Sequence, residues 1–134
     1  MLGGNSPVTI WNRYRDKYYR TKIPTLCRCR QKTNHHHTGA GEGMVSNISS
    51  SIVFVIPLLD NYLSPHEWRE LEDKTEKFTV KAEDYIAAGI HKHEIGDVTV
   101  PELRRSLEGQ FVEIKAVNYS LLARLGKHIR AEGV

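Results

Sequence analysis

Cysteine and histidine are the residues of this sequence with the clearest capacity for chemistry, because both can hold a zinc ion. Cys27 and Cys29 stand two positions apart, and the run His35, His36 and His37 follows shortly after them. Structural zinc sites usually place roughly two to four residues between paired cysteines. Three adjacent histidines cannot all converge on one ion. The sequence therefore predicts no metal site, and it favours two partly buried cysteines that share one strand face and pack into a barrel wall.

A second group of titratable residues lies near position 90. His91, His93, Glu94 and Asp97 are side chains of the types used in general acid–base catalysis. No nucleophile, glycine-rich phosphate loop or second metal-type cluster accompanies them. We therefore expect a solvated turn here, with no cofactor and no enzymatic activity. A small zinc-dependent enzyme or regulator stays open as the least favoured of three hypotheses, and the other two are given below.

Basic and aromatic residues interleave near the start of the chain. They are Trp11, Arg13, Tyr14, Arg15, Tyr18, Tyr19 and Arg20. Rings that stack, combined with cations, are what proteins that bind single-stranded nucleic acid use. The same composition suits a barrel strand, or a basic surface that docks on an acidic protein face. Two hypotheses stay open from this segment: a nucleic-acid-binding module built on Trp11, Tyr14, Tyr18 and Tyr19, and a basic protein contact.

Charge is distributed unevenly along the chain. Residues 1–32 hold eight Lys and Arg against the single acid Asp16, so this segment carries a charge of +7 within a protein whose net charge is only +3. The acidic residues that follow include Glu67, Glu70, Glu72 and Asp73. We predict that the basic segment of one subunit meets the acidic stretch Asp60–Glu76 of its neighbour, which is a heterologous contact of the kind that closes rings.

These residues need a scaffold, and length and composition indicate a single small domain. The chain has 134 residues, 40% of them hydrophobic and 26% charged, as in soluble globular domains. Residues 1–7 are expected to form a flexible arm, and residues 8–134 one domain. The longest apolar run, Ile52–Leu59, is too short to cross a bilayer. The N-terminal residues lack the pattern of a secretory signal. An intracellular protein with no membrane partner is the natural expectation.

Alternating apolar residues predict a mainly-β domain. The expected strands are Val8–Asn12, Thr25–Arg30, Ile52–Ile56, a leg within Phe78–Ala88, Phe111–Val117, and a last strand within Tyr119–Val134. Pro24 predicts that the second strand begins there or lies at an edge. Ser64 and Thr99, each followed by proline and then glutamate, predict the starts of two short helices, the second ending at Gly109. Together these features predict a small β-barrel or sandwich of about six strands with two short helices.

Residues 31–51 break the alternation. They combine the three histidines with Gly39, Gly41, Gly43 and Met44. A long segment without periodicity in a compact domain is usually functional or disordered. We therefore predict a long glycine-bearing loop at about 31–51, inserted after the second strand.

The order of these features resembles a known class of protein. The chain runs from Val8-Thr-Ile-Trp-Asn-Arg-Tyr through Tyr18-Tyr-Arg-Thr to an apolar strand that ends at Ile56-Pro57. It continues with Phe78-Thr-Val-Lys-Ala-Glu-Asp-Tyr-Ile-Ala-Ala-Gly, Phe111-Val-Glu-Ile-Lys-Ala-Val and Gly126-Lys-His-Ile-Arg-Ala-Glu-Gly133. This order is similar to that of small structural proteins from the head–tail module of tailed bacteriophages and prophages, described as minor capsid, head–tail joining or head-closure (stopper) proteins.

The resemblance implies a function in the neck of the virion. Such subunits form a ring of about six or twelve copies between the portal or adaptor and the tail terminator or tail tube. They close the DNA channel, touch packaged DNA without sequence specificity, and assemble in the host cytoplasm. The channel loop would hold His35, His36, His37, Gly39, Gly41, Gly43 and Met44. Subunit or partner contacts would come from Arg13, Arg15, Tyr18, Tyr19, Arg20, Glu67, Glu70, Glu72 and Asp73. A tail-terminator or tail-completion ring is the alternative that the resemblance allows.

Overall fold

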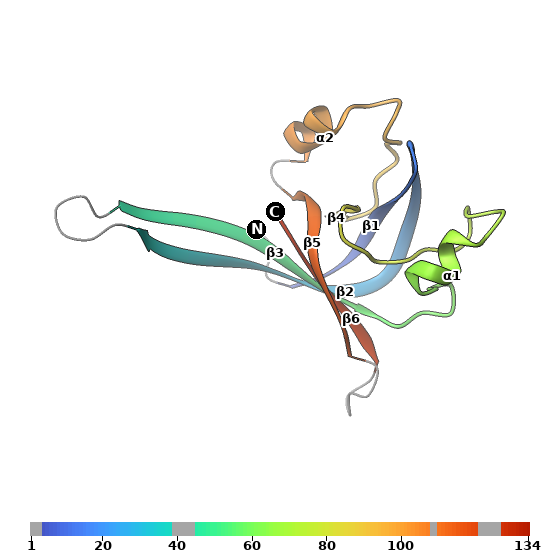
Figure 1. Cartoon of the computed structure of the whole chain (residues 1–134), viewed down its shortest axis with the longest axis horizontal. Helices are drawn as coiled ribbons and strands as arrows, with labels where there is room; N and C mark the ends of the chain where they lie inside the picture. Colours follow the sequence, from blue (N-terminus) through green and yellow to red (C-terminus); the bar gives the residue numbers. More distant parts are fainter. Residues whose placement is uncertain (1–3, 39–44, 108–109, 121–126) are drawn as a thin grey trace.

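The computed structural model describes residues 4–38, 45–107, 110–120 and 127–134. Its elements are β1 (Asn5–Tyr14), β2 (Lys17–Thr38), β3 (Val45–Pro57), α1 (Pro65–Arg69), β4 (Tyr85–Ala88), α2 (Val100–Ser106), β5 (Phe111–Ser120) and β6 (His128–Gly133). The strands pair antiparallel and close into a barrel in the order β1-β2-β3-β6-β5-β4 (Figure 1). The predicted fold class, a mainly-β barrel with two short helices, is confirmed.

The barrel interior is filled by the apolar side chains that alternate along the strands. Val8 and Ile10 enter it from β1, Phe54 and Ile56 from β3, and Ile129 from β6, all with no exposed surface. The barrel closes where Thr9 of β1 pairs with Ala87 of β4. Since a closed barrel has no free sheet edge, this pairing completes the wall.

A second apolar cluster lies on the outer side of β1. Trp11 is completely buried there with Phe111 and Leu103 of α2, and its indole N–H donates to the carbonyl of His93 at 2.9 Å. Both faces of β1 are therefore covered, the inner face by the barrel core and the outer face by α2 and the segment before it.

The second strand is longer than predicted and passes through Pro24. The β1–β2 register shifts between Ser6 and Val8, so that residues 24–26 of β2 bulge away from regular pairing. Proline has no N–H to give to a ladder, and a bulge is one of the few places where a strand accepts it. The prediction that the strand begins at Pro24 or lies at an edge is wrong, because β2 begins at Lys17 and is paired with β1 and β3.

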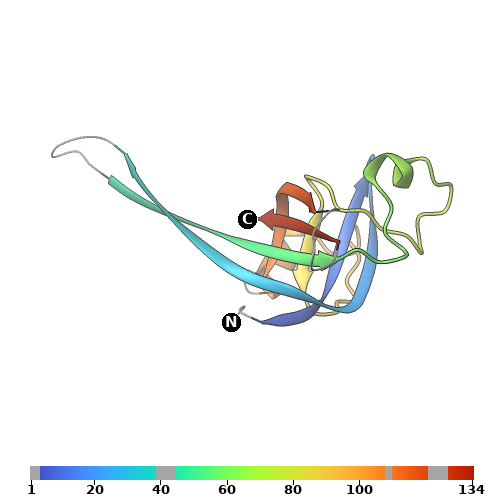
Figure 2. The ribbon, with the colours of Figure 1, turned by 90° about the horizontal axis from the view of Figure 1, so that it is seen from below.

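The predicted loop over residues 31–51 is largely a β-hairpin. Its two arms, residues 31–38 and 45–52, pair in unbroken register from Gln31↔Ile52 to Thr38↔Val45. At about 3.3 Å per residue, the eight residues from Gln31 to Thr38 extend for about 25 Å, and the hairpin projects away from the barrel (Figures 1 and 2). Residues 39–44, which include Gly39, Gly41, Gly43 and Met44, lie outside the described residues.

The leg Phe78–Ala88 is a strand only in its last four residues, where it forms β4. Glu83 has a φ of 76° and the Asp84 side chain is completely buried. That carboxylate accepts hydrogen bonds from the Asn12 side chain at 2.7 Å and from the Arg13 backbone N–H at 2.9 Å. These bonds hold the chain against the end of β1, so residues 78–84 leave the ladder that alternation predicted.

The two helices begin where their caps predicted. The Ser64 hydroxyl accepts from the Glu67 N–H, and the Thr99 hydroxyl from the Glu102 N–H, each with proline in the first turn. The second helix ends with Leu107 as its cap, two residues before the predicted stop, and Gly109 itself lies outside the described residues. Over the described part of the chain, no helix has the length and apolar character needed to cross a membrane.

Candidate functional site

The β2–β3 hairpin is the feature that stands apart from the barrel. The last β1–β2 pair is Asn5↔Arg28, after which the Cys29 N–H still donates to the Gly4 carbonyl at 3.0 Å, and β6 leaves β3 at Ile52↔Gly133. Beyond these two points each arm of the hairpin is paired only with the other arm, among the residues that the structure describes. The predicted channel residues His35, His36 and His37 lie on the β2 arm of this hairpin.

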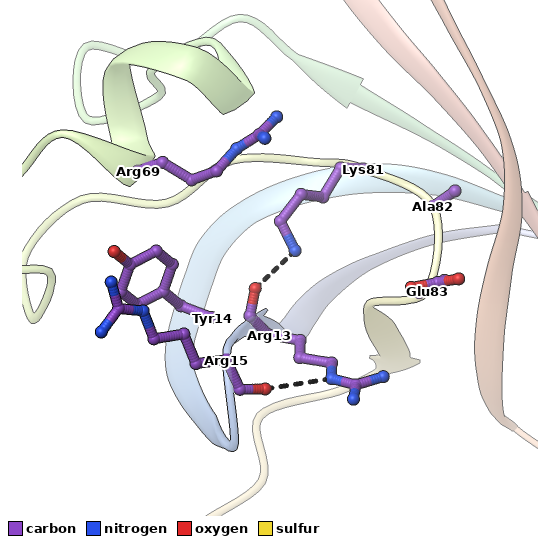
Figure 3. A pocket seen from close by; sticks show the side chains of 7 residues that line it. All are labelled: Arg13, Tyr14, Arg15, Arg69, Lys81, Ala82 and Glu83. Atoms are coloured by element: carbon purple, nitrogen blue, oxygen red, sulfur yellow. Dashed lines mark hydrogen bonds between the residues drawn. The ribbon is translucent and has the colours of Figure 1, made fainter.

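A basic pocket lies at the opposite end of the barrel wall, around the tight turn between β1 and β2. It has a volume of about 580 Å³, and its lining residues are Arg13, Tyr14, Arg15, Arg69, Lys81, Ala82 and Glu83 (Figure 3). Three segments far apart in sequence supply them. They are the β1–β2 turn, helix α1 and the stretch before β4. Arg15, in this turn, has a φ of 57°, which lies in the left-handed region.

The pocket carries excess positive charge. Lys81 is neutralised by the buried carboxylate of Asp84 and also donates to the backbone carbonyl of Arg13. The guanidinium groups of Arg13, Arg15 and Arg69 have no carboxylate within ion-pair distance among the described residues. Glu83 is the only acid in the lining. This arrangement suits a small anionic group such as a carboxylate or a phosphate.

The aromatic residues of the basic segment are engaged within the chain. Tyr14 and Tyr19 both meet the buried ring of Trp68 edge-on, at 6.1 and 5.9 Å between centroids. Tyr18 packs on Tyr85 at 5.7 Å. Trp11 is buried and cannot stack on a base, whereas Tyr14, Tyr18 and Tyr19 are partly exposed. The nucleic-acid-binding module therefore stays a prediction, based on the three tyrosines without Trp11.

Helix α1 brings the acidic stretch next to the basic segment of the same chain. Through Trp68 it packs on Tyr14 and Tyr19. The acids themselves stay on the surface: Glu67, Glu70, Glu72 and Asp73 are all exposed. The pKa of Asp73 is lowered because the hydroxyl and backbone N–H of Thr75 donate to its carboxylate. Basic and acidic contact residues therefore share one end of the molecule. The sequence does not show this proximity, because the two groups are far apart along the chain.

Arg20, another predicted contact residue, is used inside the chain. It pairs with Glu94 at 3.0 Å and donates to the carbonyl of His91 at 2.9 Å. The ring of His91 contacts the Ala88 carbonyl, and the carbonyl of His93 receives the Trp11 indole. The residues around position 90 thus fasten an outer segment onto the barrel.

The two cysteines lie inside the barrel. Both are free thiols in the main core, which confirms that they share one face of β2. Burial raises the pKa of Cys27 to about 12 and that of Cys29 to about 11. Within the described residues, no three or more His, Cys, Asp and Glu side chains come together in a way that could hold a metal ion.

Sequence reasoning missed two of the basic residues of the pocket. Arg69 lies on a helix that the sequence marked only for its acids, and Lys81 lies in a segment predicted as strand. Neither carries a local signal that would link it to Arg13 or Arg15, because the packing of Trp68 on the β1–β2 turn is what brings them together.

Comparison with known proteins gives one relationship. A family model described as "Family of unknown function (DUF6751)" matches residues 3–134. No curated protein matches the chain, and no solved structure matches it.

Proposed function

The chain belongs to the DUF6751 family of unknown function, and we propose that it is a structural protein of the neck of a tailed bacteriophage. In this function it forms a ring between the portal or adaptor and the tail. It closes the DNA channel after packaging and presents a docking face to the tail. It performs no enzymatic reaction. The proposal combines the order of sequence features described above with the shape of the subunit.

The observation that carries the proposal is the β2–β3 hairpin, which extends beyond the barrel. A closed barrel gives each subunit a stiff body without free sheet edges in its wall. The hairpin adds an arm of about 25 Å, estimated from the strand rise, that shares both its strands with the wall. Several such arms pointing inward from a ring would obstruct its central channel. The gate is then a paired ribbon instead of the irregular loop that the sequence predicted.

The docking face is proposed at the opposite end, where the basic pocket and the exposed acids lie together. Arg13 and Arg15 are exposed there, and so are Glu70 and Glu72. A face that carries both signs can pair with a partner of complementary pattern and fix its orientation. Tyr18, Tyr19 and Arg20 make contacts within the chain, and their partly exposed side chains border this face.

The test is genetic, in a phage or prophage that carries the gene. Loss of the gene should leave heads that package DNA and then lose it, together with free tails of normal length, and the full chain supplied in trans should restore tailed particles. If full, sealed heads accumulate beside tails of abnormal length, the ring belongs to the tail terminator. Particles of normal number, form and infectivity without the gene would show the proposal to be wrong.

A hairpin-shortened variant separates the two parts of the proposal. Removing residues 33–50 and joining Lys32 to Ser51 by Asn-Gly keeps the register, because Lys32 and Ser51 are paired and a two-residue turn of this type closes an antiparallel pair. We expect this variant to support tail attachment but to leave the channel leaky. Retention of DNA equal to that of the full chain would remove the hairpin from the closure mechanism.

A further inference from the structure

Three arginines form a basic patch on the outer wall of the barrel. Arg28 and Arg30 lie on β2, and Arg130 lies on β6. The strand between them, β3, contributes Val53 and Val55 to the same face, and the five residues line a small depression of about 80 Å³. We call these three arginines the wall patch.

The register explains their grouping. Val55 pairs with Arg28 on one side and with Arg130 on the other, and Arg30 pairs with Val53. Val53 lies on the outer face of β3, opposite the side chains that fill the barrel core, yet it is only 2% exposed. The aliphatic stems of long side chains commonly cover apolar surface in this way, with the charged group held in water.

The charge of the wall patch is not compensated. None of the three arginines has a carboxylate partner within ion-pair distance in the described part of the chain, whereas the next cation along β2, Lys32, pairs with Glu132 at 3.5 Å. Like charges that neighbour one another on a sheet destabilise it. A fold that keeps three of them together without an acid gains when an anion covers them.

The spacing of the cations indicates which anion. The pocket at the β1–β2 turn has a volume of about 580 Å³, whereas the depression between the wall-patch arginines has only about 80 Å³, so most of an anion bound there would lie over the outer surface of the sheet. Along β2 its cations recur every second residue, which is about 6.7 Å from the strand rise. Two guanidinium groups at this spacing on one strand and a third on β6 fit a polyanion with regularly spaced charges, and Arg in particular forms bidentate contacts with phosphate.

We propose that the wall patch of Arg28, Arg30 and Arg130 binds the phosphate backbone of DNA without sequence specificity. Its biological meaning rests on the proposed function, because the patch lies at the root of the hairpin, where the hairpin leaves the barrel. Hairpins that enter a channel would bring their roots to its wall. The contact itself is a property of the single subunit and is measurable without any phage.

The experiment compares two matched triple variants of the full chain. Arg28→Gln/Arg30→Gln/Arg130→Gln removes the wall patch, and Arg13→Gln/Arg15→Gln/Arg69→Gln removes the same number of unpaired charges from the pocket. Glutamine keeps most of the aliphatic stem over the valines. Binding of a labelled duplex of arbitrary sequence is followed by fluorescence anisotropy as salt is raised from low concentration, and circular dichroism confirms that each variant is folded.

Three phosphate contacts contribute about −2.7 to the slope of log K against log salt. We expect the wall-patch variant to lose this part of the slope. When salt is raised fourfold, the affinity of the wild-type chain should therefore fall by a factor about 40 times larger than that of the variant. The pocket variant should keep the wild-type slope. Arg28→Lys/Arg30→Lys/Arg130→Lys, which retains the charge, should keep most of it.

Other outcomes overturn the proposal. It is wrong if the wild-type chain does not bind the duplex, if both glutamine variants lose affinity equally, or if only the pocket variant does. A wall-patch variant that binds DNA normally but no longer assembles into tailed particles in trans would assign the patch to a protein contact. The DNA-binding measurements do not bear on the neck function itself, which the gene-loss experiment tests separately.

Discussion

Lys81 and Asp84 connect the basic pocket to the barrel, and their replacement tests how this end of the molecule is held. The Asp84 side chain has no exposed surface, and that of Lys81 has 19%. Burial raises the pKa of Asp84 above its ordinary value even though Lys81, the Arg13 backbone and Asn12 all favour its charged form. Lys81→Met removes the only cation paired with this carboxylate among the described residues and leaves it buried.

The expected loss follows from that geometry. Breaking a buried ion pair from one side costs about 3–5 kcal/mol. Because Lys81 is partly exposed, we expect the lower end, about 3 kcal/mol of unfolding free energy at neutral pH. Asp84→Asn/Lys81→Met leaves no unpaired buried charge, so it should be more stable than Lys81→Met alone.

The loss should depend on pH in a defined direction. Where the folded pKa of an acid is raised, the folded state binds more protons than the unfolded state, so stability falls as pH rises from the ordinary carboxyl pKa of about 4 towards the folded value. Lys81→Met raises the folded pKa of Asp84 further and widens this window. Its destabilisation should therefore be greatest at neutral and alkaline pH and shrink as the pH approaches about 4.

Urea unfolding followed by circular dichroism, at several pH values, measures the wild type and both variants. The double variant is the matched control, because its stability should not show the added pH dependence. A Lys81→Met variant as stable as the wild type, or one whose loss is the same at every pH, would show that the Asp84 carboxylate is not held charged by Lys81 in a buried site.

Three further predictions concern the barrel. Gly133→Ala places a Cβ 2.5 Å from the Glu113 carbonyl oxygen and should cost about 2 kcal/mol by overpacking. Gly4→Ala, where nothing lies within 4 Å, is its control and should stay within about 0.5 kcal/mol in thermal unfolding. Cys27 and Cys29 should react with a thiol reagent at mildly alkaline pH only after denaturant is added, because burial raises both pKa values; immediate reaction would contradict the buried placement. Trp68→Ala should cost about 3–5 kcal/mol and release α1 from the β1–β2 turn, which limited proteolysis within residues 60–76 would report.

Much of the barrel could be predicted because its strands obey simple alternation. Ile52–Ile56, for example, is apolar throughout, and β3 is indeed a central strand paired on both sides. The caps at Ser64 and Thr99 were equally direct, since capping depends on a few adjacent residues. In such places local sequence and global fold agree.

The failures have a different origin. Trp11 was taken as an accessible ring because it stands among interleaved basic and aromatic residues, yet α2 covers the outer face of β1 and buries it. The hairpin lacks the apolar alternation by which strands are recognised, because its arms leave the barrel and are not sorted by an apolar core. The basic pocket depends on contacts between residues more than fifty positions apart, and no local pattern records them.

The hairpin and the barrel wall are one continuous pair of strands, and this continuity has a mechanical consequence. A push at the far end of the ribbon acts on a lever whose fulcrum lies near Arg28 and Ile52, where pairing with β1 and β6 begins. The ribbon can flex along its free length, but it cannot swing at its base without breaking backbone hydrogen bonds of the wall. Pressure on the arm is thus borne by the whole cylinder and not by a soft hinge.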